Sequence, residues 1–389
     1  METGELAESV RNRSVLRQLH IETTGIPGKC KRAFQGASAA AGLTSKSQTG
    51  KEEPEGFSAG GRPVISSAGP LPGYSDMPWC QVTAAANSLS AMGAVPAVFS
   101  LQGLLPPAYE ESSLREDMKR FDEAARIENA AICHADIQVS REITAVQYFV
   151  TGIGWAAAGT TETGEQAPER MKGDTNRVAL AQQELCRGKE QTLTQQELCR
   201  GEEQTLTQQE LCPGQELVLT RRIALAGTAA LVRAHEEALQ QRFPFRLVDR
   251  ARGFGQWMSV TEAARAVNHF GPYPMLALSQ GGIFNALWEM AEQTGVGLEV
   301  DLKKIPIYQE TVEICEYFDI NPYYLYSAGA LLIGTDRAED LIAMLREKDI
   351  PACVIGRVTD KKDRVILNGE NRRYLDRPKR DELWRFETK

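Results

Sequence analysis

Three near-identical copies of a 13-residue unit run in tandem through the middle of the chain. They read AQQELCRGKEQTL, TQQELCRGEEQTL and TQQELCPGQELVL, from Ala181 to Leu219. A helix turns by about 100° per residue, so this period moves Leu185, Leu198 and Leu211 off any common stripe, and an odd period swaps the faces of a strand at each copy. The repeats therefore predict a solvent-exposed insertion between two folded halves. Only the third copy, which ends CPGQELVLT, is expected to continue into a strand.

On the amino-terminal side of the insertion, short apolar runs alternate with one segment of helical period. Ser113–Glu128 carries an apolar stripe, and Ser113 with Glu116 forms a predicted capping box at its start. Lys46–Arg62 is polar and rich in glycine, which indicates a loop. The strands expected here are Pro63–Ser67, Ala97–Leu101 and Gln147–Ile153, and the stripe of the helix is Leu114, Met118, Phe121 and Ala125.

The carboxyl-terminal side shows the same alternation more regularly. Gly282–Thr294 has an apolar face of Ile283, Phe284, Leu287, Met290 and Ala291, and Gly295 is the expected stop signal. Asp336 and Glu339 form a second predicted capping box before another helix. The remaining expected elements are helices at Gly227–Gln241 and Val260–His269 and buried strands at Ala328–Gly334 and Ala352–Val358. The chain is therefore predicted to be an α/β protein, an α+β sandwich of helices on sheets in two domains.

Composition excludes several classes of function. The chain has 389 residues, of which 42% are hydrophobic and 25% charged, and a net charge of -8. This negative charge argues against nucleic acid or an anionic membrane surface as the main partner. No apolar run approaches the length of a membrane span, and the charged N-terminus lacks the apolar stretch of a signal peptide. A cytoplasmic location is therefore expected.

The cysteines do not suggest a disulfide scaffold or a metal site. The eight of them include three copies within the repeats, and the other five are far apart in the chain. Cys133 and His134 are adjacent, but adjacency without further ligands at suitable spacing does not predict a metal. We expect buried, reduced thiols at Cys30, Cys80, Cys133, Cys315 and Cys353.

A glycine pair opens the most regular helix of the chain, in the stretch MLALSQGGIFNALWEM from Met275 to Met290. Such a turn lets backbone N–H groups approach a phosphate at a helix N-terminus, where the helix dipole also favours an anion. Phosphate chemistry usually requires a metal held by carboxylates, and Met275–Gly282 contains none. The pattern is typical either of a weak anion site without Mg²⁺ or of a turn that only lets the helix pack closely.

Several long segments resemble the aminoimidazole ribonucleotide (AIR) synthase, or PurM-like, superfamily. The segments PIYQETVEICEYFDINPYYLYSAGALLIGT, IPACVIGRVTDKKDRVIL and DRPKRDELW are similar to its C-terminal domain, and the resemblance covers nearly all of Cys212 to Trp384. Before the insertion, AAANSLSAMGAVPAVFSLQGLLPP and QYFVTGIG resemble its nucleotide-binding domain. The nearest subgroup looks like AIR synthase-related proteins similar to the hydrogenase maturation carbamoyl dehydratase (HypE-like).

The resemblance implies an ATP-dependent activity that this chain departs from. The family activates an oxygen by phosphorylation, with Mg²⁺ held by acidic residues from several loops. At the matching positions most of those acids are replaced, although a shift of register in HADIQ would retain Asp136. The replacing residues are Ala37 and Ser38 in QGASAA, Ala68 and Gly69 in ISSAGPLPG, Ser88 after Asn87, Gln138 in HADIQ, Ala226 in ALAGT, and Leu276, Ala277 and Gln280 in LALSQGG.

Three hypotheses follow. In the first, the chain is a degenerate pseudoenzyme that acts as a binding or regulatory homodimer. In the second, it is an active ATP-dependent enzyme with a metal site rebuilt from Asp76, Asp136 and Asp301. In the third, it is a product of relaxed selection without a specific activity. The hydrogenase maturation factor uses a cysteine at its extreme C-terminus, whereas this chain ends DELWRFETK, so that chemistry is not expected here.

The first hypothesis gives the most complete set of expectations. Residues 1–158 would form the nucleotide-binding-type domain with a dimerising mixed sheet, 159–211 the low-complexity insertion, and 212–389 the C-terminal domain. No catalytic or metal-binding residue is assigned. A vestigial phosphate site is expected at Asn87, Gln280, Gly281 and Gly282, where ATP stays open as a ligand and Mg²⁺ is not expected. The expected partners are a second copy of the chain and an unknown protein or small-molecule anion, with no nucleic acid and no membrane.

Overall fold

The computed structural model describes residues 4–19, 62–71, 79–156 and 210–386. All described residues belong to one compact unit, formed by Met1–Ala157 and Gln208–Lys389. The first two repeat copies, the QGASAA segment, Cys30 and Asp76 lie outside the described residues. The exposure of the insertion and the domain boundaries therefore stay predictions.

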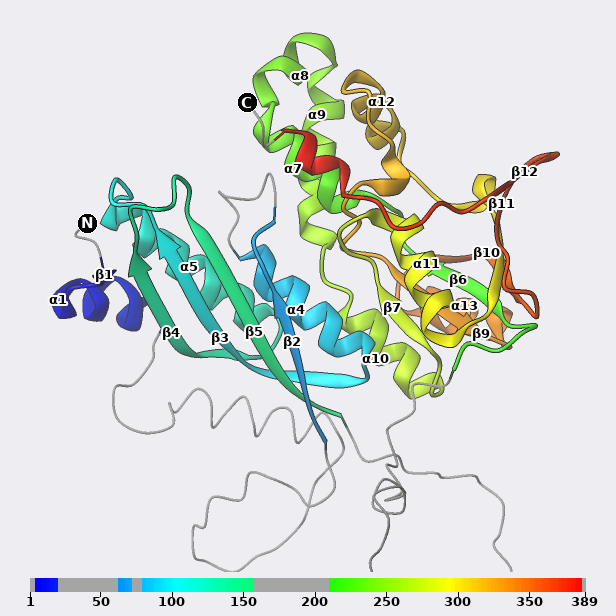
Figure 1. Ribbon diagram of the computed structural model, residues 1–389, viewed down its shortest axis with the longest axis horizontal. Helices are drawn as coiled ribbons and strands as arrows, with labels where there is room; N and C mark the ends of the chain where they lie inside the picture. The colour runs from blue at the N-terminus through cyan, green and yellow to red at the C-terminus, as the bar shows by residue number, and fades with distance from the viewer. Residues whose placement is uncertain (1–3, 20–61, 72–78, 157–209, 387–389) are drawn as a thin grey trace, which may run out of the picture. The chain divides into compact units, whose positions relative to one another are not determined.

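The residues before the insertion form a mixed five-stranded sheet in the order β1-β4-β3-β5-β2. β3 runs parallel to β4, and the other neighbours are antiparallel. Helices α4 (Cys80–Ala91) and α5 (Glu111–Ile127) pack against this sheet and lie behind it in Figure 1. The strands are β1 (Gly4–Glu5), β2 (Arg62–Ala68), β3 (Ala94–Leu105), β4 (Ala131–Val139) and β5 (Gln147–Ala156).

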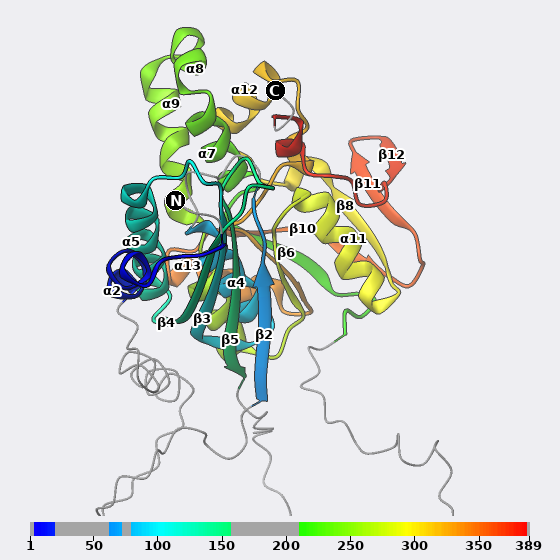
Figure 2. The same cartoon turned by 60° about the vertical axis from the view of Figure 1, so that its left-hand side comes forward.

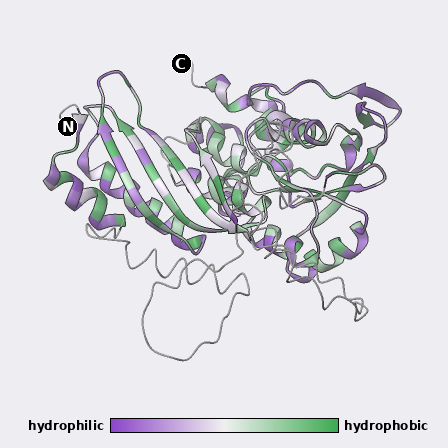
Figure 3. Ribbon diagram, turned by 60° about the horizontal axis from the view of Figure 1, so that its bottom comes forward, coloured by the Kyte–Doolittle hydropathy of each residue, from purple (hydrophilic) through white to green (hydrophobic). Residues whose placement is uncertain are grey.

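Alternation of side chains explains how this sheet buries one face. Along β4 every second residue from Ala135 to Val139 is buried and the residues between them are exposed. Figure 3 shows hydrophobic and hydrophilic residues alternating along the strands. The predicted stripe of Leu114, Met118, Phe121 and Ala125 is fully buried in the core beneath the sheet. An N-terminal helical segment, with α1 (Glu8–Val10), a π-helical stretch (Arg11–Leu16) and α2 (Arg17–Leu19), packs beside α5.

The residues after the insertion form a mixed seven-stranded sheet in the order β12-β11-β8-β10-β6-β9-β7. Its strands are β6 (Glu216–Thr220), β7 (Met275–Ala277), β8 (Gly297–Asp301), β9 (Leu331–Thr335), β10 (Ala352–Thr359), β11 (Arg364–Asn368) and β12 (Asn371–Tyr374). The helices are α7 (Leu225–Ala234), α8 (Glu236–Arg242), α9 (Phe245–Arg252), α10 (Thr261–Phe270), α11 (Gly282–Thr294), α12 (Gln309–Tyr317) and α13 (Ala338–Glu347). Figure 2 shows α11 beside β8. The predicted mixed α/β architecture is confirmed.

Several expected element boundaries are wrong. Helix α5 begins at Glu111, so Ser113 lies inside it and forms no capping box, and α13 begins at Ala338 without a side-chain cap from Asp336. The helix expected over Gly227–Gln241 is interrupted at His235, which separates α7 from α8. The two capping boxes fail because tertiary packing, rather than a local capping pattern, fixes where these helices begin.

Two further expectations need correction. β9 begins only at Leu331, because Gly329 before it has a φ of 106°, outside the extended region that a strand requires. β10 is only partly buried, so Cys353 is a half-buried thiol like Cys133, whereas Cys80 and Cys315 are fully buried as expected. Within the four described ranges no helix is both long enough and apolar enough to cross a membrane.

Candidate functional site at the start of helix α11

The glycine pair before α11 is required by the backbone. Gly281 and Gly282 have φ angles of 79° and 64°, in the left-handed region that side chains rarely tolerate. A Cβ on Gly281 would collide with the side chain of Asn285, and a Cβ on Gly282 would lie 2.5 Å from the carbonyl oxygen of Tyr323. Close packing alone is therefore enough to require glycine at both positions. This is the second of the two interpretations that the sequence allowed for this turn.

Helix α11 matches its expected bounds and orientation. It runs from Gly282 to Thr294 and ends at Gly295, whose φ of 68° provides the left-handed stop. All five residues of its predicted inner face are buried. Its first turn contains no acidic residue. The free N–H groups at this end therefore need an acceptor from elsewhere in the chain.

Asp381, one hundred residues further along the chain, provides that acceptor. The N–H of Gly281 donates to Oδ2 of Asp381 at 2.6 Å, and the N–H of Leu383 donates to Oδ1 at 2.9 Å. A further backbone hydrogen bond to this carboxyl comes from Tyr326. The side chain is 4% exposed, and burial raises the pKa of Asp381 to about 6 even though the backbone donors act in the opposite direction.

The predicted site residues do not share one set of contacts. Gln280 accepts a hydrogen bond from the indole Nε1 of Trp384 at 3.4 Å. Asn87, which is 2% exposed in α4, donates to the carbonyl of Met258 and accepts from the N–H of Val260, both at 2.8 Å. Its amide thus holds the backbone just before α10, whereas Gly281 is held by Asp381. The assignment of these residues to a phosphate site stays a prediction.

Other positions singled out in the sequence have structural roles. Ala226 is fully buried in the first turn of α7. Asp136 and Gln138 lie on the exposed side of β4 and hydrogen-bond to each other at 3.3 Å. Asp301 accepts from the N–H of Lys303 at the end of β8. In the described part of the chain, no three His, Cys, Asp or Glu side chains converge as metal ligands would.

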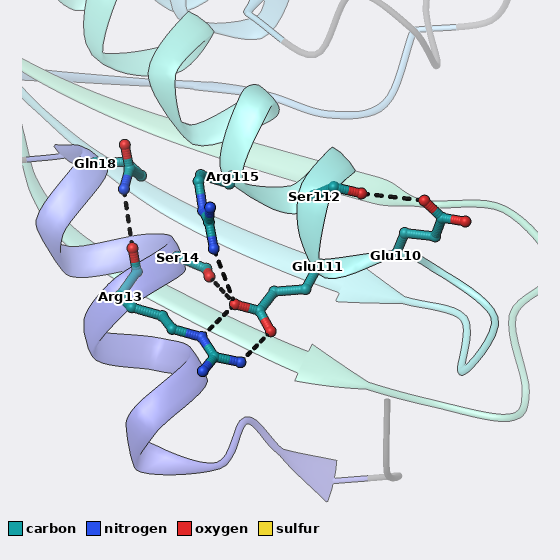
Figure 4. Close-up of polar contacts among 7 residues, drawn as sticks. All are labelled: Arg13, Ser14, Gln18, Glu110, Glu111, Ser112 and Arg115. Atoms are coloured by element: carbon teal, nitrogen blue, oxygen red, sulfur yellow. Dashed lines mark hydrogen bonds and ion pairs between the residues drawn. The ribbon is translucent and has the colours of Figure 1, made fainter.

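A second carboxylate, Glu111, holds the N-terminal helical segment against α5. It lies at the first residue of α5, and Figure 4 shows the guanidinium of Arg13 and the hydroxyl of Ser14 both directed at it. Nε of Arg13 and Oγ of Ser14 each lie 2.5 Å from Oε1 of Glu111. The paired Arg13, followed by the Ser14 hydrogen bond, lowers the pKa of Glu111 to about 2. This carboxylate ties the N-terminal helical segment to α5.

Sequence reasoning missed Asp381. The segment DRPKRDELW was noted only for its resemblance to a family motif, and its three acids looked equivalent. Buried Leu383, two residues after Asp381, is the one local signal, because an Asp whose side chain accepts the N–H two residues on forms a local turn. No local pattern identifies Gly281 as its second partner.

Comparison with known proteins agrees with this description. Residues 212–368 match the family described as "AIR synthase related protein, C-terminal domain". A carbamoyl dehydratase HypE from Rhodobacter capsulatus is 34% identical over 84 residues, which are 21% of this chain and 25% of that protein. The chain thus matches about a quarter of the length of this curated relative.

Solved structures extend the similarity of fold to most of the chain. HypE from E. coli, a hydrogenase maturation protein, is 18% identical with a TM-score of 0.61, and the match covers 90% of this chain and 96% of that one. A HypE solved in complex with ATP is 16% identical with a TM-score of 0.60, over 96% of this chain and 95% of that one. At such low identity these matches establish the fold alone. Residues 212–368 are thus similar to an AIR synthase related C-terminal domain, and the chain has the mixed α/β fold of the PurM-like HypE structures.

Proposed function

We propose that this protein is a non-catalytic PurM-like binding or regulatory protein, whose ATP- and Mg²⁺-dependent chemistry has been lost. The contact between Asp381 and Gly281 carries the proposal. A phosphate at the start of α11 would use the Gly281 N–H, and the chain's own buried carboxylate already accepts from it. A second negative charge placed beside Asp381 would be repelled in this water-poor environment.

Replacement of the matching acids elsewhere supports the same conclusion. Ala226 and Ala68 stand where the resemblance expects carboxylates, and neither side chain can bind a divalent cation. Restoring acids at the glycine turn alone would therefore leave the metal without its other ligands. The double variant Ala277→Asp, Gln280→Glu is expected to remain inactive.

Calorimetry with Mg-ATP, together with an assay of phosphate release, tests this proposal. We expect no Mg²⁺-dependent binding and no hydrolysis above a sample without protein. Hydrolysis that requires Mg²⁺ in the wild-type protein would contradict it and favour an active ATP-dependent enzyme. The fold match to a HypE bound to ATP favours that second candidate, and its metal ligands would include exposed Asp136.

We further propose that the protein acts as a homodimer through the five-stranded sheet. Strand pairing places Ile65, Ile153 and Val98 in one row across the face opposite α4 and α5. Ile65 is 63% exposed, and Phe149, on the same side of β5 as Ile153, is 38% exposed. Val98 itself is buried, but the exposed Ile65 and Phe149 leave apolar surface on this face, which is typical of a surface that a second copy covers.

Sedimentation of the full chain at micromolar concentration tests the dimer. We expect a dimer for the wild-type protein and a monomer for Ile65→Glu, because the new carboxylate would be buried in the interface. Ile127→Glu is the matched control, since Ile127 is 69% exposed but lies at the end of α5, away from the strand row. A wild-type monomer, or equal effects of the two substitutions, would refute this interface.

A further inference from the structure

Strand β12 is the outer strand of the seven-stranded sheet, and all of its residues are exposed. Figures 1 and 2 both show it at the periphery, joined to β11 by a tight hairpin. Gly369 allows this turn with a φ of 63°. Among the described residues, no strand pairs with the outer edge of β12. The edge therefore offers unpaired main-chain groups to another chain.

The register of the hairpin identifies which main-chain groups face outward. The N–H of Leu375 donates to the carbonyl of Arg364 at 2.8 Å, which extends the ladder of β11 and β12 by one hydrogen-bonded pair. In an antiparallel ladder such pairs alternate, so Arg373 directs its N–H and C=O at β11. The N–H and C=O groups of Arg372 and Tyr374 therefore point to the free edge.

This edge is strongly basic in a chain that is acidic as a whole. The ten residues Asn371–Arg380 contain five arginines and lysines and one aspartate, whereas the whole chain has a net charge of -8. Lys379 is paired with Asp376, but none of the ion pairs described in the structure involves Arg372. An unpaired guanidinium beside outward main-chain groups favours a partner that carries carboxylates.

Charge on an edge strand also has a simpler role, because it keeps sheets of different molecules from joining edge to edge. A second copy of β12 would bring the arginines of the two strands close together, and like charges on neighbouring strands are destabilising. The same arginines attract a strand with glutamates at the facing positions. The edge thus repels its own copy and stays open to an acidic strand.

The chain on the far side of β12 is fixed, so the edge is already ordered. Leu375 is buried in the main hydrophobic core directly after the strand. Further on, the side-chain amide of Asn285 donates to the carbonyl of Lys379 at 2.8 Å and accepts from the N–H of Lys379 at 3.0 Å. A partner strand would therefore not have to order β12 before it binds.

A concavity of about 540 Å³ lies beside the edge, and its lining includes Arg372, Val365 and Arg357. Val365 is the cross-strand neighbour of Tyr374, which is 69% exposed, so Tyr374 lies on this side of the hairpin. Arg357 is paired with Glu299 at 2.8 Å. Arg372 is therefore the arginine of this concavity that a carboxylate of a partner can reach without breaking a described ion pair.

We propose that the outer edge of β12 is a docking site for an extended acidic segment of a partner protein, which joins the sheet as a further strand. Its main chain pairs with the outward groups of Arg372 and Tyr374, and its carboxylates pair with Arg372 and Arg373. This inference goes beyond the proposed function and holds whether or not the protein hydrolyses ATP. The proposed function fails on Mg²⁺-dependent turnover, whereas the docking site fails on peptide binding.

Fluorescence polarisation with the full chain tests the site. The probe is a labelled peptide of sequence Thr-Val-Glu-Glu-Val-Thr, and the control peptide has two lysines in place of the glutamates. We expect saturable binding of the acidic peptide alone, weakened by added salt. Binding of both peptides with equal affinity, or of neither, would refute the docking site.

Arg372→Glu should weaken binding of the acidic peptide by about tenfold, because an attractive pair becomes a repulsive one. Arg346→Glu is the matched control, since Arg346 is an exposed arginine in the last turn of α13 and the change of charge is the same. That control should alter binding by less than about twofold. Equal weakening by the two substitutions would mean that only the overall charge matters.

Tyr374→Pro tests the main-chain pairing without a change of charge. Proline lacks the outward N–H, and at this edge position it removes no hydrogen bond within the sheet. Tyr374→Ala controls for loss of the ring. We expect the proline variant to bind the peptide about fivefold more weakly than the alanine variant. Equal affinities would show that the peptide does not bind as a strand.

Amide hydrogen exchange of the wild-type protein needs no substitution. Saturating peptide should slow exchange at Arg372 and Tyr374 by about tenfold and leave Arg373 nearly unchanged, since its N–H already pairs with β11. Equal protection of all three amides would contradict strand addition. A single-stranded oligonucleotide that binds more tightly than the acidic peptide would overturn the proposal and make this edge a nucleic-acid surface.

Discussion

The two ends of the described chain are each fastened by one carboxylate, in opposite physical settings. Glu111 receives the N-terminal segment at the protein surface, with a guanidinium as its main partner, and its pKa falls to about 2. Asp381 is buried, accepts backbone N–H groups without a paired cation, and its pKa rises to about 6. The same functional group is thus stabilised by charge at one end and made costly to ionise by burial at the other.

The largest effect is expected from removing Asp381. Asp381→Ala leaves the N–H groups of Gly281 and Leu383 buried without their acceptor, which should lower the free energy of unfolding by about 3 kcal/mol. Urea denaturation measures this change. Asp376→Ala, five residues earlier in the chain, should cost less than about 0.5 kcal/mol, because this carboxylate is exposed and pairs only with Lys379 among the ion pairs described. If the two substitutions lower the free energy of unfolding equally, burial of the carboxylate does not determine its contribution.

The pH dependence of stability should differ in sign between the two ends. The folded pKa of Asp381 lies above its value in an unfolded chain, so its contribution is fully present below about pH 4 and is lost as pH rises through about 6. The wild-type protein should therefore lose up to about 2 kcal/mol over this range relative to Asp381→Asn. If the wild-type protein instead loses stability relative to Asp381→Asn as the pH falls, the fold favours ionised Asp381.

This expectation takes into account the charges around Asp381. Glu382, next to it, raises its pKa further, and Tyr326 from the neighbouring loop is neutral at these pH values because its own pKa is well above 10. Two cations close to Asp381 in the chain are engaged elsewhere: Lys379 pairs with Asp376, and Arg380 lies over the ring of Trp384. No described cation is paired with Asp381 to offset its burial.

Glu111 should show the opposite dependence with a smaller effect. Its folded pKa lies below the unfolded value, so its stabilisation is present above about pH 4.5 and is lost as pH falls towards 2. Glu111→Gln should lower the melting temperature at neutral pH, and added salt should reduce the difference because the Arg13 pair is exposed. A salt-independent difference would mean that the hydrogen bond from buried Ser14 dominates.

The smallest effect is expected from the insertion. Deleting Ala181–Leu206, the first two repeat copies, should leave the melting temperature nearly unchanged, because a segment with neither helical nor strand period buries little apolar surface. The deletion keeps both carboxylate anchors, so the pH profiles of the two ends should also be unchanged. A large drop in the melting temperature would show that the repeats pack on the folded halves.

Sequence patterns predicted what depends on neighbours along the chain. The bounds of α11, its Gly295 stop and its buried face follow from helical periodicity, and the third repeat copy does enter strand β6. The expected capping boxes at Ser113 and Asp336 are wrong, because helix ends respond to tertiary contacts. The acceptor of Gly281 could not be predicted at all, since pairing residues one hundred positions apart depends on the complete fold.

The two-way contact between Asn285 and the main chain of Lys379 implies an uneven tolerance to substitution. Recognition of backbone atoms ignores the identity of the side chain, so position 379 should accept almost any residue in a saturation-mutagenesis library. Proline is the exception, since it lacks the N–H that Asn285 requires. Position 285 should be restrictive, because an aspartate or leucine there cannot both donate and accept. The segment around residue 379 can therefore vary in sequence and still keep its position relative to α11.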